Sequence, residues 1–211
     1  WDVSTGKVIV SLSAGTTLWK GVFSPDGRHV VTVGDDGIGR IWDSLTGQLL
    51  IQLAGHTALS CAVLYSQDGQ WIATGSEDKT ARLWNARTGK LEKTLGTGTI
   101  GKGHADWVTS LAFARDGKTL LTASHDGTTI GWNVATGEFH FALVGHHEGI
   151  WSVQYSPDGK RIVTASADHT ARVWSAESHE LLGVLKGHLG TVTFADFSPD
   201  EAIMVCWPGR L

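Results

Sequence analysis

Residues 55–89 read GHTALSCAVLYSQDGQWIATGSEDKTARLWNARTG, and residues 145–179 present the same marks in the same order. Each segment opens on Gly-His and then contains an Asp-Gly turn, a Thr, an Asp and a Trp at matching positions. Asp bonds back to the backbone and Gly accepts a positive φ, so an Asp-Gly pair marks a tight turn. The stretches between the turns are rich in β-branched and small residues, which predicts short antiparallel strands.

The same unit recurs along the whole chain of 211 residues. A tryptophan followed by a small polar residue occurs at Trp1, Trp42, Trp84, Trp132 and Trp174, at separations of 41, 42, 48 and 42 residues. Gly-His pairs begin at Gly55, Gly103, Gly145 and Gly187. These marks divide the chain into repeats of approximately 3–44, 45–86, 87–134, 135–176 and a partial 177–211. A period of this length predicts one supersecondary unit per repeat, stacked on its neighbours.

The repeat unit is predicted to contain strands and almost no helix. No segment shows apolar residues at a convincing helical spacing, whereas 120–123 and 161–165 are apolar on both faces. Short strands with two apolar faces must stack around an axis to bury them, which predicts a β-propeller. With its Gly-His, Asp and Trp-Asp marks, the chain resembles the WD-repeat family over nearly its whole length. The resemblance implies an all-β WD-repeat β-propeller.

The strand pattern predicts four complete four-stranded blades with partial blades at both ends. The complete blades are expected over 17–53, 59–95, 107–143 and 149–185, with an orphan outer strand near 7–13 and an inner pair near 191–206. We therefore expect an open arc, an excerpt of a ring of roughly seven blades, which is the commonest size in the family that the chain resembles. Residues 201–211 lose the repeat pattern, so their place in a repeat stays open.

A His, a Thr, an Asp and a Trp recur at fixed offsets, and we call each set a tetrad. The complete tetrads are His56, Thr74, Asp78 and Trp84; His104, Thr122, Asp126 and Trp132; and His146, Thr164, Asp168 and Trp174. Hydroxyl, imidazole and carboxylate are also the groups of a nucleophilic triad. A catalytic site is needed once, whereas this set recurs, so we interpret it as a buried network that fixes each blade. The resemblance implies the same structural role.

The first repeat departs from this pattern, because Ser13-Ala14 stands where Gly-His is expected. This departure predicts that the first blade is less firmly held than the others.

A glycine-rich insertion lies in the third repeat. Residues 96–103, GTGTIGKG, match G-x-G-x-x-G and the first part of a phosphate loop. Such a loop needs a following helix, whereas residues 106–113 read as a strand, so we interpret the insertion as a surface loop. The two cysteines, Cys61 and Cys206, and the scattered histidines form no metal-ligand pattern. No cofactor and no metal are expected.

Function in a repeat array is expected where the repeats differ. The varying positions stand at the start of each innermost strand and just before each tetrad aspartate, and in the WD-repeat family such positions face the mouth of the central channel. The candidate partner-binding residues are Trp19, Leu59, Trp107, Trp151, Asp35, Glu77 and His125. Aromatic anchors in a concavity are typical of peptide-binding sites, although packing between blades uses the same residue types. We expect the 96–103 loop to hang over the same face.

The sequence favours a non-catalytic protein-protein interaction scaffold that grips a segment with an apolar side chain and an Arg or Lys. A sugar-binding propeller and an enzymatic propeller with a site at the channel mouth stay as alternatives. A net charge of −4 without a basic run disfavours nucleic acid, and no apolar run is long enough to span a membrane. A cytoplasmic location is expected. The repeats are unusually similar to one another, and in this the chain resembles bacterial WD-repeat proteins, in which such arrays often follow signalling domains.

Overall fold

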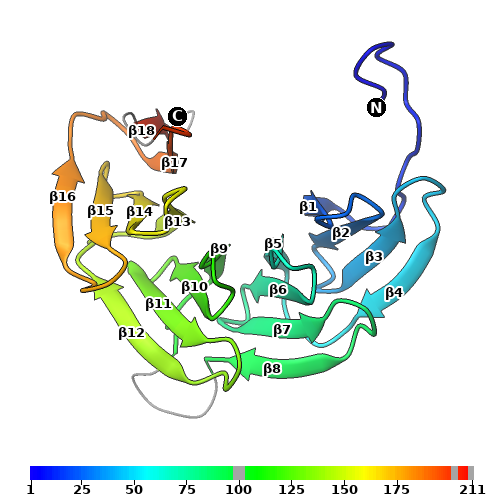
Figure 1. The fold of residues 1–211 in the computed structure, drawn as a ribbon, viewed down its shortest axis with the longest axis horizontal. Helices are drawn as coiled ribbons and strands as arrows, with labels where there is room; N and C mark the ends of the chain where they lie inside the picture. The colour runs from blue at the N-terminus through cyan, green and yellow to red at the C-terminus, as the bar shows by residue number, and fades with distance from the viewer. Residues whose placement is uncertain (97–102, 201–203, 209–211) are drawn as a thin grey trace.

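The computed structural model describes residues 1–96, 103–200 and, as backbone only, 204–208. Within them the chain forms antiparallel strands and no helix. No helix in these residues is long and apolar enough to cross a membrane. Four sheets of four strands follow one another around an open arc, which ends in a two-stranded sheet (Figure 1). The prediction of an all-β propeller built of four-stranded blades is confirmed.

Each four-stranded sheet is one blade, and its strands follow in chain order from the centre of the arc outward. Blade 1 consists of β1 (Leu18–Phe23), β2 (His29–Gly34), β3 (Gly39–Asp43) and β4 (Leu49–Leu53). Blade 2 consists of β5 (Ser60–Tyr65), β6 (Trp71–Ser76), β7 (Ala81–Asn85) and β8 (Leu91–Leu95). Blade 3 consists of β9 (Val108–Phe113), β10 (Thr119–Ser124), β11 (Thr128–Asn133) and β12 (Phe139–Val144). Blade 4 consists of β13 (Ile150–Tyr155), β14 (Arg161–Ser166), β15 (Ala171–Ser175) and β16 (Leu181–Leu185).

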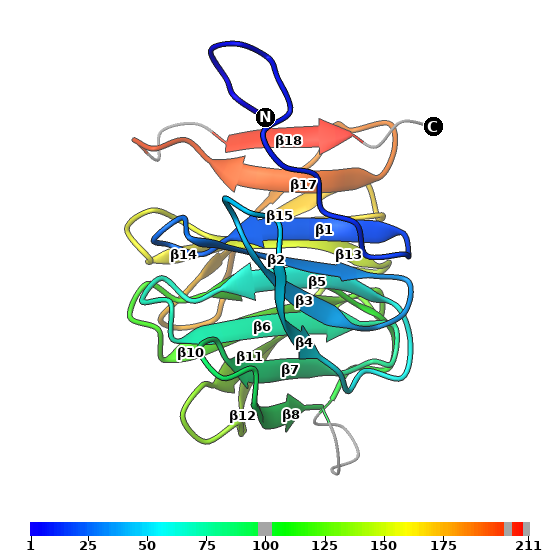
Figure 2. The same cartoon turned by 90° about the vertical axis from the view of Figure 1, so that its right-hand side faces the viewer.

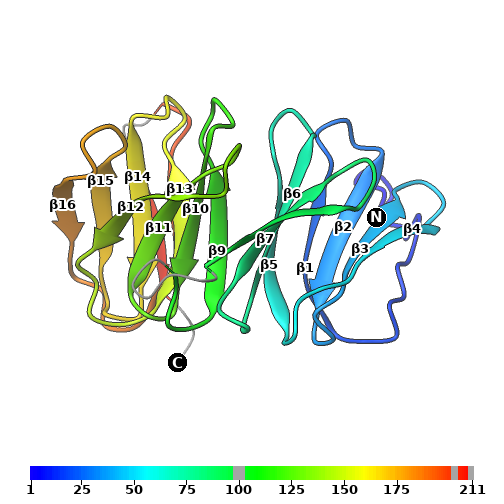
Figure 3. The ribbon, with the colours of Figure 1, turned by 90° about the horizontal axis from the view of Figure 1, so that it is seen from below.

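The inner strands β1, β5, β9 and β13 point along the view in Figure 1 and lie lengthwise in Figure 3, while the outer strands turn into the plane of the arc. Figure 2 shows β1 and β5 lengthwise from the side. This change of direction is the twist of each sheet. All inner strands run the same way, so the molecule has two distinct faces. We call the face where the inner strands begin the mouth face, and the face where they end the exit face.

The hydrophobic core lies between neighbouring blades. Val31 and Val33 of blade 1 pack with Ile72 and Trp84 of blade 2, and equivalent clusters fill the next two interfaces. Burying a side chain of this size contributes about 1.5 to 3 kcal/mol. Contact between blades therefore holds the arc together, and each tetrad tryptophan faces the preceding blade.

The two ends of the arc differ from each other. β17 (Val192–Phe197) and β18 (Met204–Pro208) pair as the expected inner pair. The second strand lies within 201–211, where the sequence loses the repeat pattern. The prediction of an outer strand near 7–13 is wrong, because no strand forms there. Val10 and Leu12 still lie against Gly47, just as Ile51 lies against Gly89 in the next blade. The segment follows the path of an outer strand, but among the described residues it has no neighbouring strand to pair with.

Candidate functional site

The tetrad side chains of blades 2 to 4 form chains of hydrogen bonds. In blade 2, Trp84 Nε1 donates to Thr74 Oγ1 at 2.9 Å, and Thr74 Oγ1 lies 2.8 Å from His56 Nε2. His56 Nδ1 lies 2.8 Å from Asp78 Oδ2. Because an ionised carboxylate can only accept, the neutral imidazole carries its proton on Nδ1 and donates it to Asp78, so Nε2 accepts the proton of the Thr74 hydroxyl. The corresponding bonds join the tetrads of blades 3 and 4.

This geometry resembles a nucleophilic triad, but the hydroxyl has no access to a substrate. Thr74 is only 1% exposed, and its hydroxyl oxygen is already engaged by the Trp84 indole. A nucleophile must present its oxygen to an incoming substrate. The arrangement is therefore suited to fixing the turn between β6 and β7 within the blade.

The electrostatics of the blade 4 tetrad keep its carboxylate ionised and its imidazole neutral. Burial raises the pKa of Asp168, but hydrogen bonds from Thr170 and His146 outweigh it and lower the pKa to about 2. Burial lowers the pKa of His146, and its bond to Asp168 offsets this only in part. The pair thus acts as a charged acceptor and a neutral donor.

Blade 1 reaches a similar result by other means. Trp42 Nε1 still donates to Thr32 Oγ1 at 2.8 Å, although Ala14 supplies no imidazole. The Arg40 guanidinium instead donates to both carboxylate oxygens of Asp36, at 3.2 and 2.5 Å. In blade 4 the matching arginine, Arg172, lies 3.9 Å from its aspartate. Charge-assisted bidentate pairs are among the stronger polar contacts in proteins. An arginine thus replaces the missing histidine as the partner of this aspartate.

On the mouth face, backbone bonds hold the two sets of varying positions side by side. The backbone N–H groups of Asp35, Glu77 and His125 donate to the carbonyl oxygens of residues 17, 59 and 107 at 3.1, 2.9 and 2.9 Å. The candidate residues of each blade therefore lie together at the start of its inner strand, as the repeat register requires.

A β-bulge at the start of the inner strands places one residue outside the ladder. In blades 2 and 3 this residue bonds to the next blade: Cys61 Sγ donates to Val108 O at 3.3 Å, and Thr109 Oγ1 donates to Ile150 O at 2.5 Å. In blades 1 and 4 the same position holds Trp19 and Trp151. Bulges redirect side chains, and these two rings remain 60% and 39% exposed.

Three side chains from blades 3 and 4 form what we call the aromatic cluster: Trp107, His125 and Trp151. The His125 ring lies between the indoles, with centroid distances of 5.9 Å to Trp107 and 5.5 Å to Trp151. A Cβ on Gly149 would lie 2.7 Å from the His125 ring, so the absence of a side chain there makes room for it. Asp106 Oδ2 lies 3.6 Å from His125 Nδ1. Trp107 is 42% exposed, so much of its side chain stays accessible after packing between the blades.

The other candidate residues stand apart from this cluster. Trp19 Nε1 donates to Asp35 Oδ1 at 2.5 Å within blade 1, and Leu59 and Glu77 are half-buried in blade 2. Among the described residues, no ring contact or hydrogen bond joins Trp19 or Leu59 to the aromatic cluster. The prediction that the 96–103 loop lies over the mouth face concerns residues 97–102, which are outside the described residues.

Known proteins share the repeat that builds these sites. The family described as WD domain, G-beta repeat matches residues 6–43, 47–85, 92–133, 137–175 and 179–206. The chain belongs to this family. Proteins built of WD repeats are generally non-catalytic scaffolds. The chain is also similar to the nuclear distribution protein PAC1 of Arthroderma otae, with 43% identity over 44 residues. That stretch covers 20% of this chain and 10% of the relative, so the likeness extends over about one repeat.

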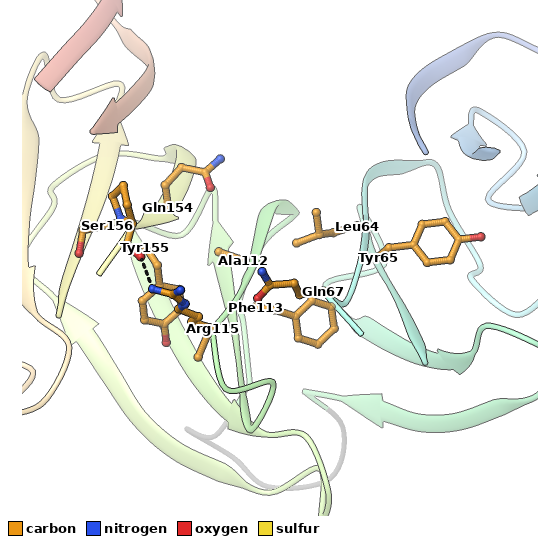
Figure 4. Close-up of a pocket in the computed structure, with 11 residues that line it drawn as sticks. Leu64, Tyr65, Gln67, Ala112, Phe113, Arg115, Gln154, Tyr155 and Ser156 are labelled. Atoms are coloured by element: carbon orange, nitrogen blue, oxygen red, sulfur yellow. Dashed lines mark hydrogen bonds between the residues drawn. The ribbon is translucent and has the colours of Figure 1, made fainter. Parts of the chain in front are cut away.

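The exit face of this WD-repeat chain holds a cavity that sequence reasoning missed. It measures about 590 Å³ and opens where β5, β9 and β13 end (Figure 4). Its lining residues are Leu64, Tyr65, Gln67, Ala112, Phe113, Ala114, Arg115, Gln154, Tyr155, Ser156 and Pro157. The available signal was Ala114-Arg115, which stands where blades 1 and 4 have Ser-Pro. In the described part of the chain, no three His, Cys, Asp or Glu residues gather as a possible metal site.

Proposed function

We propose that this WD-repeat chain is a non-catalytic scaffold that binds a segment of a partner protein on the mouth face. The aromatic cluster carries the proposal, because two partly exposed indoles from neighbouring blades stand on either side of His125. Large aromatic side chains in such positions supply most of the binding energy of many protein interfaces. The buried tetrads, in contrast, have their polar groups paired with one another and offer nothing to a ligand.

The carboxylates of the mouth face favour a basic side chain in the bound segment. Asp106 lies beside His125 of the cluster, and Asp35 and Glu77 bring further carboxylates to this face from blades 1 and 2. An ammonium or guanidinium group gains from the face of an indole as well as from a nearby carboxylate. We therefore propose a segment in which an apolar side chain packs on the cluster and an Arg or Lys pairs with a carboxylate of the mouth face. The likeness of one repeat to a nuclear distribution protein is consistent with a protein-interaction scaffold.

Affinity capture of partners by the full-length protein tests the proposal. Trp107→Ala and Trp151→Ala are each expected to weaken capture about thirtyfold, because an anchor of this kind is worth about 2 kcal/mol or more. Thermal unfolding should change little, since both rings are partly exposed. Trp71→Ala is the matched control: Trp71 begins β6 at the exit face and packs against the core between blades 2 and 3. Partners that survive the loss of both cluster tryptophans would overturn the proposal.

A sugar-binding propeller is the second candidate, because exposed indoles such as that of Trp19 also stack on sugar rings. A glycan array separates the two functions: specific glycan binding that Trp107→Ala and Trp151→Ala abolish would replace the protein segment by a saccharide. An enzyme would be indicated by hydrolysis of ester, phosphate or glycoside substrates that Asp78→Ala or His104→Ala abolishes.

A further inference from the structure

The exit-face cavity lies where blade 3 departs from its own repeat. The turn after each inner strand begins with Ser in blades 1, 2 and 4, and that hydroxyl donates to the turn aspartate at 2.5 to 2.6 Å. In blade 3, Ala114 replaces the serine and Arg115 replaces the proline of blades 1 and 4. The backbone bond of the turn is kept, since Gly117 N donates to Ala114 O at 2.9 Å. Blade 3 therefore gives up local stabilisation and gains a guanidinium group at the cavity.

The Arg115 guanidinium is held in place by one hydrogen bond, and no ion pair with an acidic side chain forms among the described residues. Arg115 Nη1 donates to Pro157 O at 3.2 Å, across the boundary between blades 3 and 4 (Figure 4). Among the described residues this is the one hydrogen bond of the side chain, and Arg115 is exposed. A guanidinium carries five N–H donors in a fixed plane, which match the two oxygens of a carboxylate. Most of these donors stay available to a ligand.

The remaining lining is neutral and partly apolar. Arg115 is the one charged residue among those that line the cavity. Leu64, Phe113 and Tyr155 supply apolar surface, while Gln67 and Gln154 supply amide groups (Figure 4). A volume of about 590 Å³ is in the range of sites that bind several side chains or a small molecule. The cavity is therefore suited to a ligand that carries one negative charge beside an apolar group.

Neighbouring charges limit the ligand to a single negative charge. A second cavity of about 320 Å³ shares Ala114, Arg115 and Tyr155 with the first, but it is also lined by Asp116 and Asp158. These two carboxylates would repel a phosphate group or another polyanion more strongly than a single carboxylate.

We propose that the exit-face cavity binds an acidic segment of a partner protein, in which an Asp or Glu side chain pairs with Arg115 and an adjacent apolar side chain packs on Phe113 and Tyr155. This site is separate from the mouth face and does not depend on the function proposed there. A scaffold with both sites would hold a basic segment on one face and an acidic segment on the other.

A pair of capped peptides tests the proposal. The probes are acetyl-Leu-Glu-Leu-amide and acetyl-Leu-Gln-Leu-amide, which differ in one charge and are titrated against the full chain by NMR. The Glu peptide is expected to bind about tenfold more tightly, and Arg115→Gln is expected to remove this preference. Arg28→Gln, which removes an exposed arginine from the corresponding turn of blade 1, should leave the preference unchanged.

Two further variants test whether a lost preference reflects misfolding, and whether the preference depends on the mouth face. The double variant Ala114→Ser, Arg115→Pro restores the turn sequence of blades 1 and 4, so it should fold at least as well as the natural chain and lose the preference. Trp107→Ala with Trp151→Ala should keep the preference even if it loses mouth-face partners. Equal binding of the two peptides, no detectable binding of the Glu peptide, or a preference that survives Arg115→Gln would each overturn the proposal.

Discussion

Removal of the Asp78 carboxylate measures what a tetrad contributes to stability. The carboxylate accepts bonds from His56 Nδ1 at 2.8 Å, from Thr57 N at 3.1 Å, and from the backbone and hydroxyl of Thr80 at 3.0 and 2.6 Å. Water can replace the bond to exposed Thr57, but the His56 side chain is only 1% exposed. Asp78→Ala therefore leaves one buried donor without its acceptor, which costs about 1 to 3 kcal/mol.

The loss should lower the melting temperature by about 2 to 12 °C, since 1 kcal/mol corresponds to about 2 to 4 °C for a chain of this size. Asp78→Asn keeps one acceptor oxygen for His56, so its effect should be smaller. Asp43→Ala is the control, because Asp43 also accepts bonds from the backbone and hydroxyl of a nearby threonine, but at an exposed turn. Thermal unfolding followed by circular dichroism compares the three variants. An Asp78→Ala melting temperature equal to that of the natural chain, or higher than that of Asp43→Ala, would refute the reasoning.

Two further predictions concern pH and the aromatic cluster. Burial lowers the pKa of His56 and of His146 in the folded chain, so the unfolded chain binds more protons as pH falls below about 6.5, and the melting temperature should decrease from pH 7.5 to pH 5.5. Asp168, whose folded pKa is lowered to about 2, should keep its contribution above about pH 4 and lose it toward pH 2; a melting temperature that rises on acidification from pH 7.5 contradicts this account. Gly149→Ala places a Cβ at 2.7 Å from the His125 ring, so it should displace the imidazole from Trp151, change tryptophan fluorescence and weaken mouth-face capture. Gly183→Ala is the control, since its Cβ would meet no atom within 4 Å, and an unchanged spectrum and capture in Gly149→Ala would count against the cluster.

The repeat marks were sufficient to predict the blades because each mark fixes a local event. Asp-Gly turns set where strands end, and the apolar stretches between them can only be buried by stacking blades. The tetrad residues meet because strand pairing brings their positions together: Ile72 pairs with Trp84, and Thr74 pairs with Arg82 on the same two strands. A constant offset in sequence thus becomes a constant geometry in each blade.

Other features depend on contacts that no local mark encodes. The segment 7–13 has the residues of a strand, but a strand needs a partner for its backbone bonds, and none is described beside it. Arg40 gives no unusual signal, because Arg82 and Arg172 occupy the same position in blades where a histidine is present. The cavity on the exit face arises from the way three inner strands end side by side, and a single repeat does not reveal it.

Residues that depart from the repeat are of two kinds: some are compensated by another contact within the blade, and others are not. We expect the first kind to serve the structure and the second kind to serve binding. In blade 1 the missing histidine is compensated inside the blade, because Arg40 pairs with Asp36. At the bulge of blade 4, Trp151 gives up a bond to the next blade of the kind that Thr109 makes. At the turn of blade 3, Ala114 gives up the serine bond to the aspartate. Each such bond contributes about 1 kcal/mol, and in these two cases the exchange leaves an indole or a guanidinium facing solvent. When a repeat loses a hydrogen bond and no other contact within the protein replaces it, we expect the new side chain to contact a partner. The mouth face and the exit face each contain such a position.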